Sequence, residues 1–303
     1  MTHADLRRTI APGATLARWR APDGWPLRRF DWPAEPARGT MIVQGGRGDI
    51  IEKCLESFAH WHALGWSVVA FDWRGHGGSG RPPLDLGHGE FATAVADLAA
   101  VWRTLPGDRP RVLIGHSMGG FLALRAAVEG AVDPAALVLV APMLGLRSPL
   151  GRFSAPVARF LRDRGDPARH AWSANERPHS RLGRQALLTS DAGRYDDEMW
   201  WHAQAPHHAA TPPSWAWLAE AFAATATLAR DSRLATLPAP VLMLVADHDG
   251  LVDARAAVRV AARLRDATLL RFGRESAHEI LREADPVRDR ALAAIDAFVD
   301  RHA

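Results

Sequence analysis

Residues 112–121 read Val112-Leu113-Ile114-Gly115-His116-Ser117-Met118-Gly119-Gly120-Phe121, and this stretch decides the fold that we expect. An apolar run of strand character leads into a Gly-x-Ser-x-Gly pattern, and a stretch with helical spacing follows it. Glycine two positions on either side of the serine lets neighbouring backbones approach closely, as a tight strand-to-helix turn requires. The amino end of the helix also favours negative charge that develops beside it. The pattern therefore predicts that Ser117 is a nucleophile on such a turn.

Short apolar runs on both sides of this turn alternate with stretches of helical spacing. The runs at 39–43, 67–72, 111–115 and 137–141 are bounded by Gly, Pro or charged residues, and candidate helices at 51–64, 91–105 and 118–129 lie between them. A second block has strand-like runs at 241–246 and 268–272 and candidate helices at 254–265 and 286–300. This alternation predicts an α/β fold with a doubly wound, mostly parallel sheet.

The stretch between the two blocks has a different character. Residues 147–231 contain no convincing strand, are rich in Trp, His, Pro and Arg, and offer candidate helices at 156–164, 196–203 and 214–230. An insertion after the carboxyl end of a strand sits above the sheet, where open α/β folds bind ligands. We therefore predict a core formed by 1–146 and 232–303, with 147–231 inserted as a helical lid.

Composition excludes several classes of protein. Apolar residues make up 48% and charged residues 23% of the 303, which is too mixed for a disordered or fibrous chain. The net charge of +3 is small and the arginines are scattered, so nucleic acid is not an expected partner. The single cysteine, Cys54, excludes an intramolecular disulfide. Without a signal-peptide pattern or a spanning run, we expect a cytoplasmic protein that makes at most transient contact with a membrane surface.

A nucleophilic serine needs a base and a carboxylate to orient that base. His278 follows the last strand-like run and precedes the last candidate helix, so it is expected at the same sheet edge as Ser117. His116 and His76 are interpreted as structural. The run at 241–246 is followed by Asp247 and Asp249, which the residues alone do not separate, and by Asp253, which is better placed to cap the next helix.

An oxyanion hole needs two backbone amides aimed at the tetrahedral intermediate. The first is predicted to be that of Met118, directly after the nucleophile. The second is expected from the loop after 39–43, which reads Gln44-Gly45-Gly46-Arg47-Gly48-Asp49. The chemistry of such a site implies no metal and no organic cofactor.

Three motifs together resemble one branch of a known superfamily. Gly46-Arg47-Gly48-Asp49, Asp72-Trp73-Arg74-Gly75-His76-Gly77-Gly78-Ser79-Gly80 and 115–120 are similar to the monoacylglycerol lipase and bacterial lysophospholipase branch of the α/β-hydrolases, a serine aminopeptidase S33-like domain. The resemblance implies that Asp249 is the catalytic acid and that Arg47 supplies the second oxyanion amide. Two positions depart from the branch: Ala246 stands where glycine is usual, and Gly45 where histidine is usual.

The resemblance also implies an activity. It predicts a serine hydrolase that cleaves carboxylic esters through an acyl-enzyme, with a lysophospholipid or a monoacylglycerol as substrate. A small-ester carboxylesterase, a lactonase or a thioesterase would use the same residues, and a non-catalytic ligand-binding protein on this fold is the alternative from another class. The oligomeric state stays open.

Side chains of the lid and of one loop are then candidates for contact with the substrate. Aromatic lid residues are expected to form an acyl-chain channel, namely Trp200, Trp201, Trp215, Trp217 and Phe222. The guanidinium of Arg47 is expected to contact the phosphate of a lysophospholipid head group, or else to form a salt bridge to a carboxylate such as Asp49.

Overall fold

Strands β1 to β8 form one sheet in the order β1-β2-β4-β3-β5-β6-β7-β8 in the computed structural model, which describes residues 3–80, 90–148, 151–171 and 181–303. The strands are β1 (Thr15–Arg20), β2 (Pro26–Trp32), β3 (Thr40–Gln44), β4 (Ser67–Phe71), β5 (Arg111–His116), β6 (Ala136–Val140), β7 (Val241–Ala246) and β8 (Ala267–Phe272). All neighbours from β4 to β8 pair in parallel, whereas β1 with β2 and β2 with β4 are antiparallel. The predicted mostly parallel α/β sheet is confirmed.

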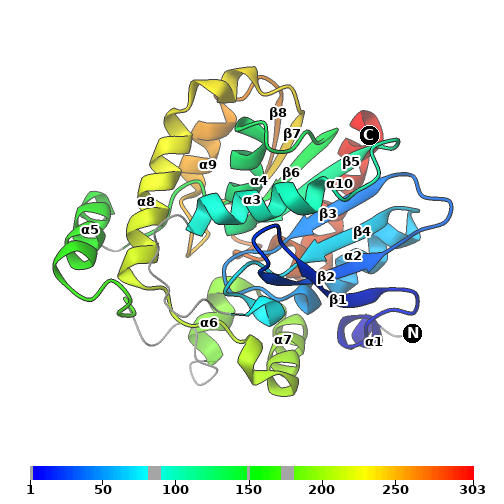
Figure 1. The fold of residues 1–303 in the computed structure, drawn as a ribbon, viewed down its shortest axis with the longest axis horizontal. Helices are drawn as coiled ribbons and strands as arrows, with labels where there is room; N and C mark the ends of the chain where they lie inside the picture. The colour runs from blue at the N-terminus through cyan, green and yellow to red at the C-terminus, as the bar shows by residue number, and fades with distance from the viewer. Residues whose placement is uncertain (1–2, 81–89, 149–150, 172–180) are drawn as a thin grey trace.

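Helices cover both faces of the sheet, as Figure 1 shows. They are α1 (His3–Arg8), α2 (Leu55–Ala63), α3 (Glu90–Trp102), α4 (Met118–Val128), α5 (Ser154–Arg164), α6 (Arg181–Leu188), α7 (Ala192–Gln204), α8 (Trp215–Arg230), α9 (Ala254–Ala261) and α10 (Asp285–His302). Short 3-10 turns include η1 (Ile51–Cys54) and η7 (Ile280–Arg282).

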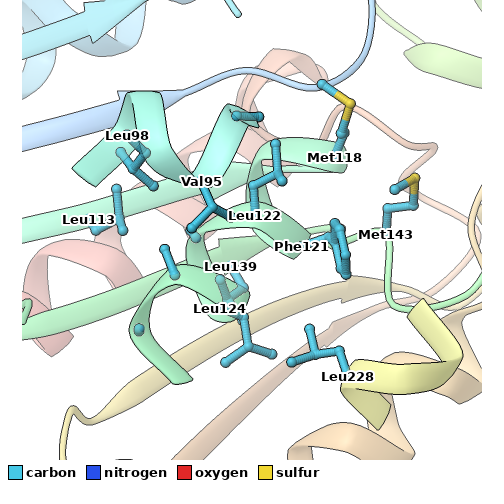
Figure 2. Packing of buried hydrophobic residues seen from close by; sticks show 14 of the residues in the cluster. Val95, Leu98, Leu113, Met118, Phe121, Leu122, Leu124, Leu139, Met143 and Leu228 are labelled. Carbon is cyan, nitrogen blue, oxygen red and sulfur yellow. The ribbon is translucent and has the colours of Figure 1, made fainter. Parts of the chain in front are cut away.

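Two apolar clusters explain why the central strands are apolar throughout. Every residue of β3, β6 and β7 is buried, because both faces of the sheet are covered. One cluster packs α3, α4, α8 and α9 against the sheet, and the other packs α2 and α10 against the opposite face. Figure 2 shows the first cluster around α4, with Phe121 and Leu124 close to Leu228 of α8. The sheet and α4 thereby hold the turn at Ser117 in place.

The antiparallel strands β1 and β2 were not predicted. In β1 exposed and half-buried residues alternate irregularly, and its sequence, Thr-Leu-Ala-Arg-Trp-Arg, lacks an apolar run. Both strands lie at one edge of the sheet, and neither pairs with β5, β7 or β8, which lead into the loops of Ser117, Asp249 and His278.

In its described residues the insertion between β6 and β7 is helical, as predicted, and it contains α5 to α8, of which α6 was not predicted. Figure 1 shows α5 at the outer margin of the molecule, while α7 lies next to α1. In the part of the chain that the structure describes, no helix has the length and apolar character needed to cross a membrane.

Candidate active site

Ser117 occupies the turn between β5 and α4 in a strained backbone conformation. Its φ of 52° and ψ of −118° are unusual for a residue with a side chain. A Cβ on Gly115 would lie 2.5 Å from the carbonyl oxygen of Gly119, and one on Gly119 would lie 2.4 Å from that of Gly45. Backbone bonds fix the turn, since the Ser117 amide donates to Val140 and its carbonyl accepts from Met143. The two flanking glycines are therefore needed for space.

His278 and Asp249 complete a hydrogen-bonded chain with this serine. The Nε2 atom of His278 lies 2.9 Å from Ser117 Oγ, and its Nδ1 atom lies 2.6 Å from Asp249 Oδ2. The other carboxylate oxygen of Asp249 accepts from the amides of Leu251, at 2.7 Å, and Val252, at 3.0 Å. The Asp249 carboxylate is thus fixed by its own loop, and it in turn fixes one edge of the imidazole.

The structure brings Asp249, and not Asp247, to the histidine. The Asp247 side chain bonds Arg271 at the surface, 2.9 Å away. Asp253 caps α9 by accepting from the amide of Arg255, as its position before that helix predicted.

Burial and charge act against each other on the His278–Asp249 pair. Burial lowers the pKa of His278, but the carboxylate of Asp249 outweighs burial and raises the pKa above its ordinary value of 6.5. Burial raises the pKa of Asp249, but the charge of His278 and the hydrogen bonds that the carboxylate accepts lower it overall. The pair therefore favours a carboxylate beside an imidazole that readily takes up a proton.

The loop after β3 lies directly against Ser117. A Cβ on Gly46 would stand only 2.8 Å from the Cβ of Ser117, so only glycine fits there. Arg47 follows it at the cavity, and Met118 is the first residue of α4. The side chain of Arg47 donates to the carbonyl oxygen of Thr211 at 2.6 Å and lies over the ring of Trp217, 5.0 Å from its centroid.

A cavity of about 530 Å³ lies beside Ser117 and His278. Its apolar wall comes from the loop after β6, α5, α8 and the loop after β7, and includes Met143, Leu146, Val157, Trp215, Trp217, Leu218, Phe222 and Val252. Charged side chains also line the cavity, namely Arg47, Asp49, Lys53, Arg147, Arg184 and Glu279. Such a volume falls within the range of small-ligand pockets, about 300–1,000 Å³.

Several of these charged side chains belong to a buried cluster of ion pairs. The ammonium of Lys53, whose side chain is 3% exposed, lies 2.5 Å from Asp49, 2.6 Å from Glu279 and 3.2 Å from Glu198. Glu198 also accepts from Arg184 at 2.7 Å and Arg282 at 2.9 Å. Burial raises the pKa of Asp49, yet Lys53 and His116 outweigh burial and hold the pKa well below its ordinary value.

His116 lies closer to the chemistry than its interpretation as structural suggested. Its Nδ1 atom is 3.0 Å from Asp49 Oδ2, its ring centroid is 4.8 Å from that of His278, and it lines the cavity. His76 bonds the carbonyl oxygen of Arg74 instead.

The structure corrects the prediction for Trp200 and Trp201, since neither lines the cavity. Both lie on the face of α7 that packs against α1. Trp201 donates its indole N–H to the carbonyl oxygen of Arg7 at 2.8 Å, and the guanidinium of Arg8 lies over the ring of Trp200. Trp215, Trp217 and Phe222, all on α8, do line the cavity.

The charged cluster was not predicted from the sequence. One local signal was available, because Lys53 follows Asp49 at the four-residue spacing of a helical ion pair. Glu198 and Arg184 lie in the insertion and gave no comparable signal. Among the described residues, no group of three or more His, Cys, Asp or Glu side chains is arranged to hold a metal ion.

Comparisons with known proteins agree with this geometry. The sequence pattern described as "Serine aminopeptidase, S33" matches residues 35–285. Lysophospholipase L2 of Escherichia coli is 30% identical over 303 aligned residues, which cover 94% of this chain and 87% of that protein. The monoglyceride lipase of Rattus norvegicus is 29% identical over 119 residues, which cover 38% of this chain and 39% of that protein.

Solved structures show the same fold. A soluble variant of monoglyceride lipase from Saccharomyces cerevisiae, in complex with a substrate analogue, gives a TM-score of 0.75 at 17% identity and covers 98% of this chain and 97% of that one. The monoacylglycerol lipase of Paleococcus ferrophilus gives a TM-score of 0.72 at 22% identity and covers 91% of this chain and 99% of that one.

Proposed function

The chain belongs to the serine aminopeptidase S33 family of α/β-hydrolases, and on this premise we propose that it hydrolyses the carboxylic ester of a lysophospholipid or a monoacylglycerol. The observation that carries the proposal is the hydrogen-bonded chain Ser117–His278–Asp249 beside a cavity that many apolar side chains line. The similarity to lysophospholipase L2 over most of both chains supports a lipid ester as substrate.

The reaction begins with proton transfer from Ser117 Oγ to His278 Nε2 as the oxygen attacks the ester carbonyl. The negative charge on the tetrahedral intermediate is stabilised by the backbone amides of Met118 and Arg47. His278 then gives its proton to the leaving alcohol, and an acyl-enzyme on Ser117 remains. Water, deprotonated by the same histidine, releases the fatty acid, and Asp249 keeps the imidazole in the required tautomer throughout.

The apolar and the charged side chains that line the cavity suit the acyl half and the alcohol half of such a substrate, respectively. We propose that 147–231 act as the lid, and that Trp215, Trp217 and Phe222 of α8 line the place of the acyl chain. The residues 1–146 and 232–303 then supply the nucleophile, base, acid and oxyanion amides. The charged side chains that line the cavity would contact the alcohol half of the ester.

A fluorophosphonate probe combined with matched substitutions tests the proposal. Labelling should be lost in Ser117→Ala, whose turnover of a long-chain monoacylglycerol should fall by about 10⁴-fold or more. Asp249→Asn should lower kcat by about 10⁴-fold, because an asparagine holds the wrong tautomer of His278. Asp247→Asn, whose aspartate bonds Arg271 at the surface, is the matched control and should retain activity.

The alternatives have distinct outcomes. An unlabelled Ser117 in the folded wild-type protein would favour a non-catalytic ligand-binding protein. Labelling with turnover of acetyl esters but none of long-chain esters would favour a small-ester carboxylesterase instead.

A further inference from the structure

The charges at the cavity bear on which lipid ester the site prefers. A lysophospholipid carries a phosphodiester, whereas a monoacylglycerol carries no charge. Four cationic side chains of the described residues line the cavity, namely Arg47, Lys53, Arg147 and Arg184. These four side chains differ in their hydrogen-bond and ion-pair partners. The partners determine which of the cations is available to neutralise the charge of a phosphate.

Lys53 and Arg184 are already neutralised. The ammonium of Lys53 has three carboxylate neighbours, Asp49, Glu198 and Glu279, which match its three N–H donors. Arg184 bonds Glu198, whose other oxygen accepts from Arg282. Within this cluster, the cations Lys53, Arg184 and Arg282 face the three carboxylates of Asp49, Glu198 and Glu279. An added phosphate would compete with buried carboxylates for the same donors.

Arg47 is directed toward the start of α8. Its guanidinium donates to the Thr211 carbonyl and stacks on Trp217, the ring that belongs to the apolar wall. A phosphate bound there would lie against the proposed acyl site. The contact of Arg47 with a phosphate head group therefore stays a prediction, and in the structure its guanidinium contacts Thr211 and Trp217.

Arg147 stands in a different environment. It lies at the mouth of the cavity, is exposed, and has no carboxylate partner among the described residues. Its backbone amide donates to the Leu251 carbonyl at 2.9 Å, and its Nη1 donates to the Asp249 carbonyl at 2.7 Å. Both acceptors are neutral, so the guanidinium is held in place while its charge stays uncompensated.

The segment that bears Arg147 is firmly attached to the loop of the catalytic acid. Its neighbour Leu146 forms an antiparallel bridge with Val252, whose amide donates to the Asp249 carboxylate. An arginine held in this way has lost part of its conformational freedom before any ligand binds. The remaining N–H groups of its planar guanidinium are suited to donate to two oxygens of a phosphate.

We infer that Arg147 binds the phosphodiester of a lysophospholipid at the mouth of the cavity and selects this substrate over an uncharged monoacylglycerol. The inference rests on the proposed ester hydrolysis at Ser117. A charge-assisted hydrogen bond from this guanidinium to the phosphate supports a preference of about 10- to 100-fold.

The test compares kcat/KM for lysophosphatidylcholine and for the monoacylglycerol with the same acyl chain, both below their micellar concentrations. In Arg147→Gln the ratio of the two values should fall by about 10- to 100-fold, while Arg147→Lys should recover part of it. Arg159→Gln, which removes an exposed arginine of α5 outside the cavity lining, is the matched control and should leave the ratio unchanged.

A binding measurement separates recognition from turnover. In the Ser117→Ala background, Arg147→Gln should weaken binding of lysophosphatidylcholine more than binding of the monoacylglycerol. Equal losses for both lipids would overturn the inference and assign Arg147 to holding the Asp249 loop. An unchanged ratio would also overturn it. Wild-type turnover of the monoacylglycerol without turnover of lysophosphatidylcholine would overturn the inference alone, whereas turnover of neither ester would overturn the proposed function as well.

Discussion

The backbone amide of Glu279 donates a hydrogen bond to the carbonyl oxygen of Leu188 at 2.7 Å, so the loop that carries His278 is paired with the end of α6. The preceding amide, that of His278 itself, donates to Leu187 at 3.3 Å. Both leucines also line the cavity. The end of α6 therefore helps to hold the site together. The insertion could not move away from the sheet as a rigid body without breaking these two hydrogen bonds.

Glu283 reinforces this pairing, and its substitution gives the first prediction. The fully buried carboxylate accepts from the Ala277 amide at 2.6 Å on one oxygen and from the Ser190 amide at 2.9 Å on the other. In Glu283→Gln the amide group replaces one acceptor by a donor. We expect the free energy of unfolding to fall by about 1–3 kcal/mol and kcat to fall about tenfold, with KM nearly unchanged.

A matched control is Glu275→Gln, an exposed carboxylate of the same loop that accepts from the Gly273 amide. It should change neither kcat nor stability appreciably. Chemical denaturation and steady-state kinetics on one soluble ester measure both quantities. A variant that loses stability but keeps its full kcat at a temperature where it is folded would show that Glu283 supports the fold without positioning His278.

The geometry of a parallel sheet explains how much of the site could be predicted from the sequence. Ser117, His278 and the loop that carries Asp249 each follow a parallel strand, and the carboxyl ends of such strands meet at one edge. The sequence order therefore sufficed to predict which loops meet. It did not separate Asp247 from Asp249, since both follow β7 within three residues and only side-chain direction distinguishes them.

The features that escaped prediction depend on contacts between distant segments. Lys53, Glu198 and Glu279 come from η1, the insertion and the loop after β8. No local sequence pattern indicates that these three side chains come together. The face of α7 that packs on α1 could not be read from the insertion alone, because tryptophan suits either an acyl channel or ordinary packing. Trp200 and Trp201 were misplaced for that reason.

The pH dependence of catalysis gives the second prediction. His278 must be neutral to accept the serine proton, and Asp249 raises its pKa above 6.5. We expect kcat/KM for an uncharged ester to increase with pH through a midpoint above about 6.5 and then to level off. A rate profile measured well below KM reports this pKa for the free enzyme. A midpoint below about 6 would contradict the assigned role of the His278–Asp249 pair.

The third prediction separates the two pairs of tryptophans. Trp215 lines the cavity, whereas Trp201 packs near α1, and both are partly exposed. Each methylene buried in the acyl site contributes about 0.8 kcal/mol, or about fourfold in kcat/KM. In Trp215→Ala this gain per methylene should shrink for the longer members of an ester series, while acetyl ester turnover changes little.

Trp201→Ala is the matched control for Trp215→Ala. It removes the hydrogen bond to the Arg7 carbonyl and the packing near α1, so it should lower the melting temperature. Its dependence of kcat/KM on chain length should equal that of the wild type. If both variants altered the chain-length dependence alike, the acyl chain would not follow the α8 wall.

The last prediction concerns Lys53 and the stability of the buried ion-pair cluster. In Lys53→Met the carboxylates of Asp49, Glu198 and Glu279 lose the cation that lies between them. Removing one partner from a buried ion pair leaves an uncompensated charge, which costs about 3–5 kcal/mol. We expect a decrease of this size in the free energy of unfolding in urea at neutral pH. Arg125→Met, which breaks a partly exposed pair with Glu129, should cost less than about 1 kcal/mol.

The pH dependence of this loss identifies its cause. Burial raises the pKa values of Asp49 and Glu198, but Lys53 and neighbouring donors outweigh burial and hold both well below their ordinary values in the wild type. Carboxyls whose pKa is lowered by folding stabilise the protein above their unfolded pKa, and this stabilisation is lost as the pH falls through the folded pKa.

Without Lys53 the folded-state pKa values of Asp49 and Glu198 should rise. The deficit of Lys53→Met relative to the wild type should therefore be largest near pH 7 and smaller near pH 4, where the unpaired carboxyls of the variant take up protons. Equal deficits at the two pH values would instead attribute the loss to packing of the lysine side chain.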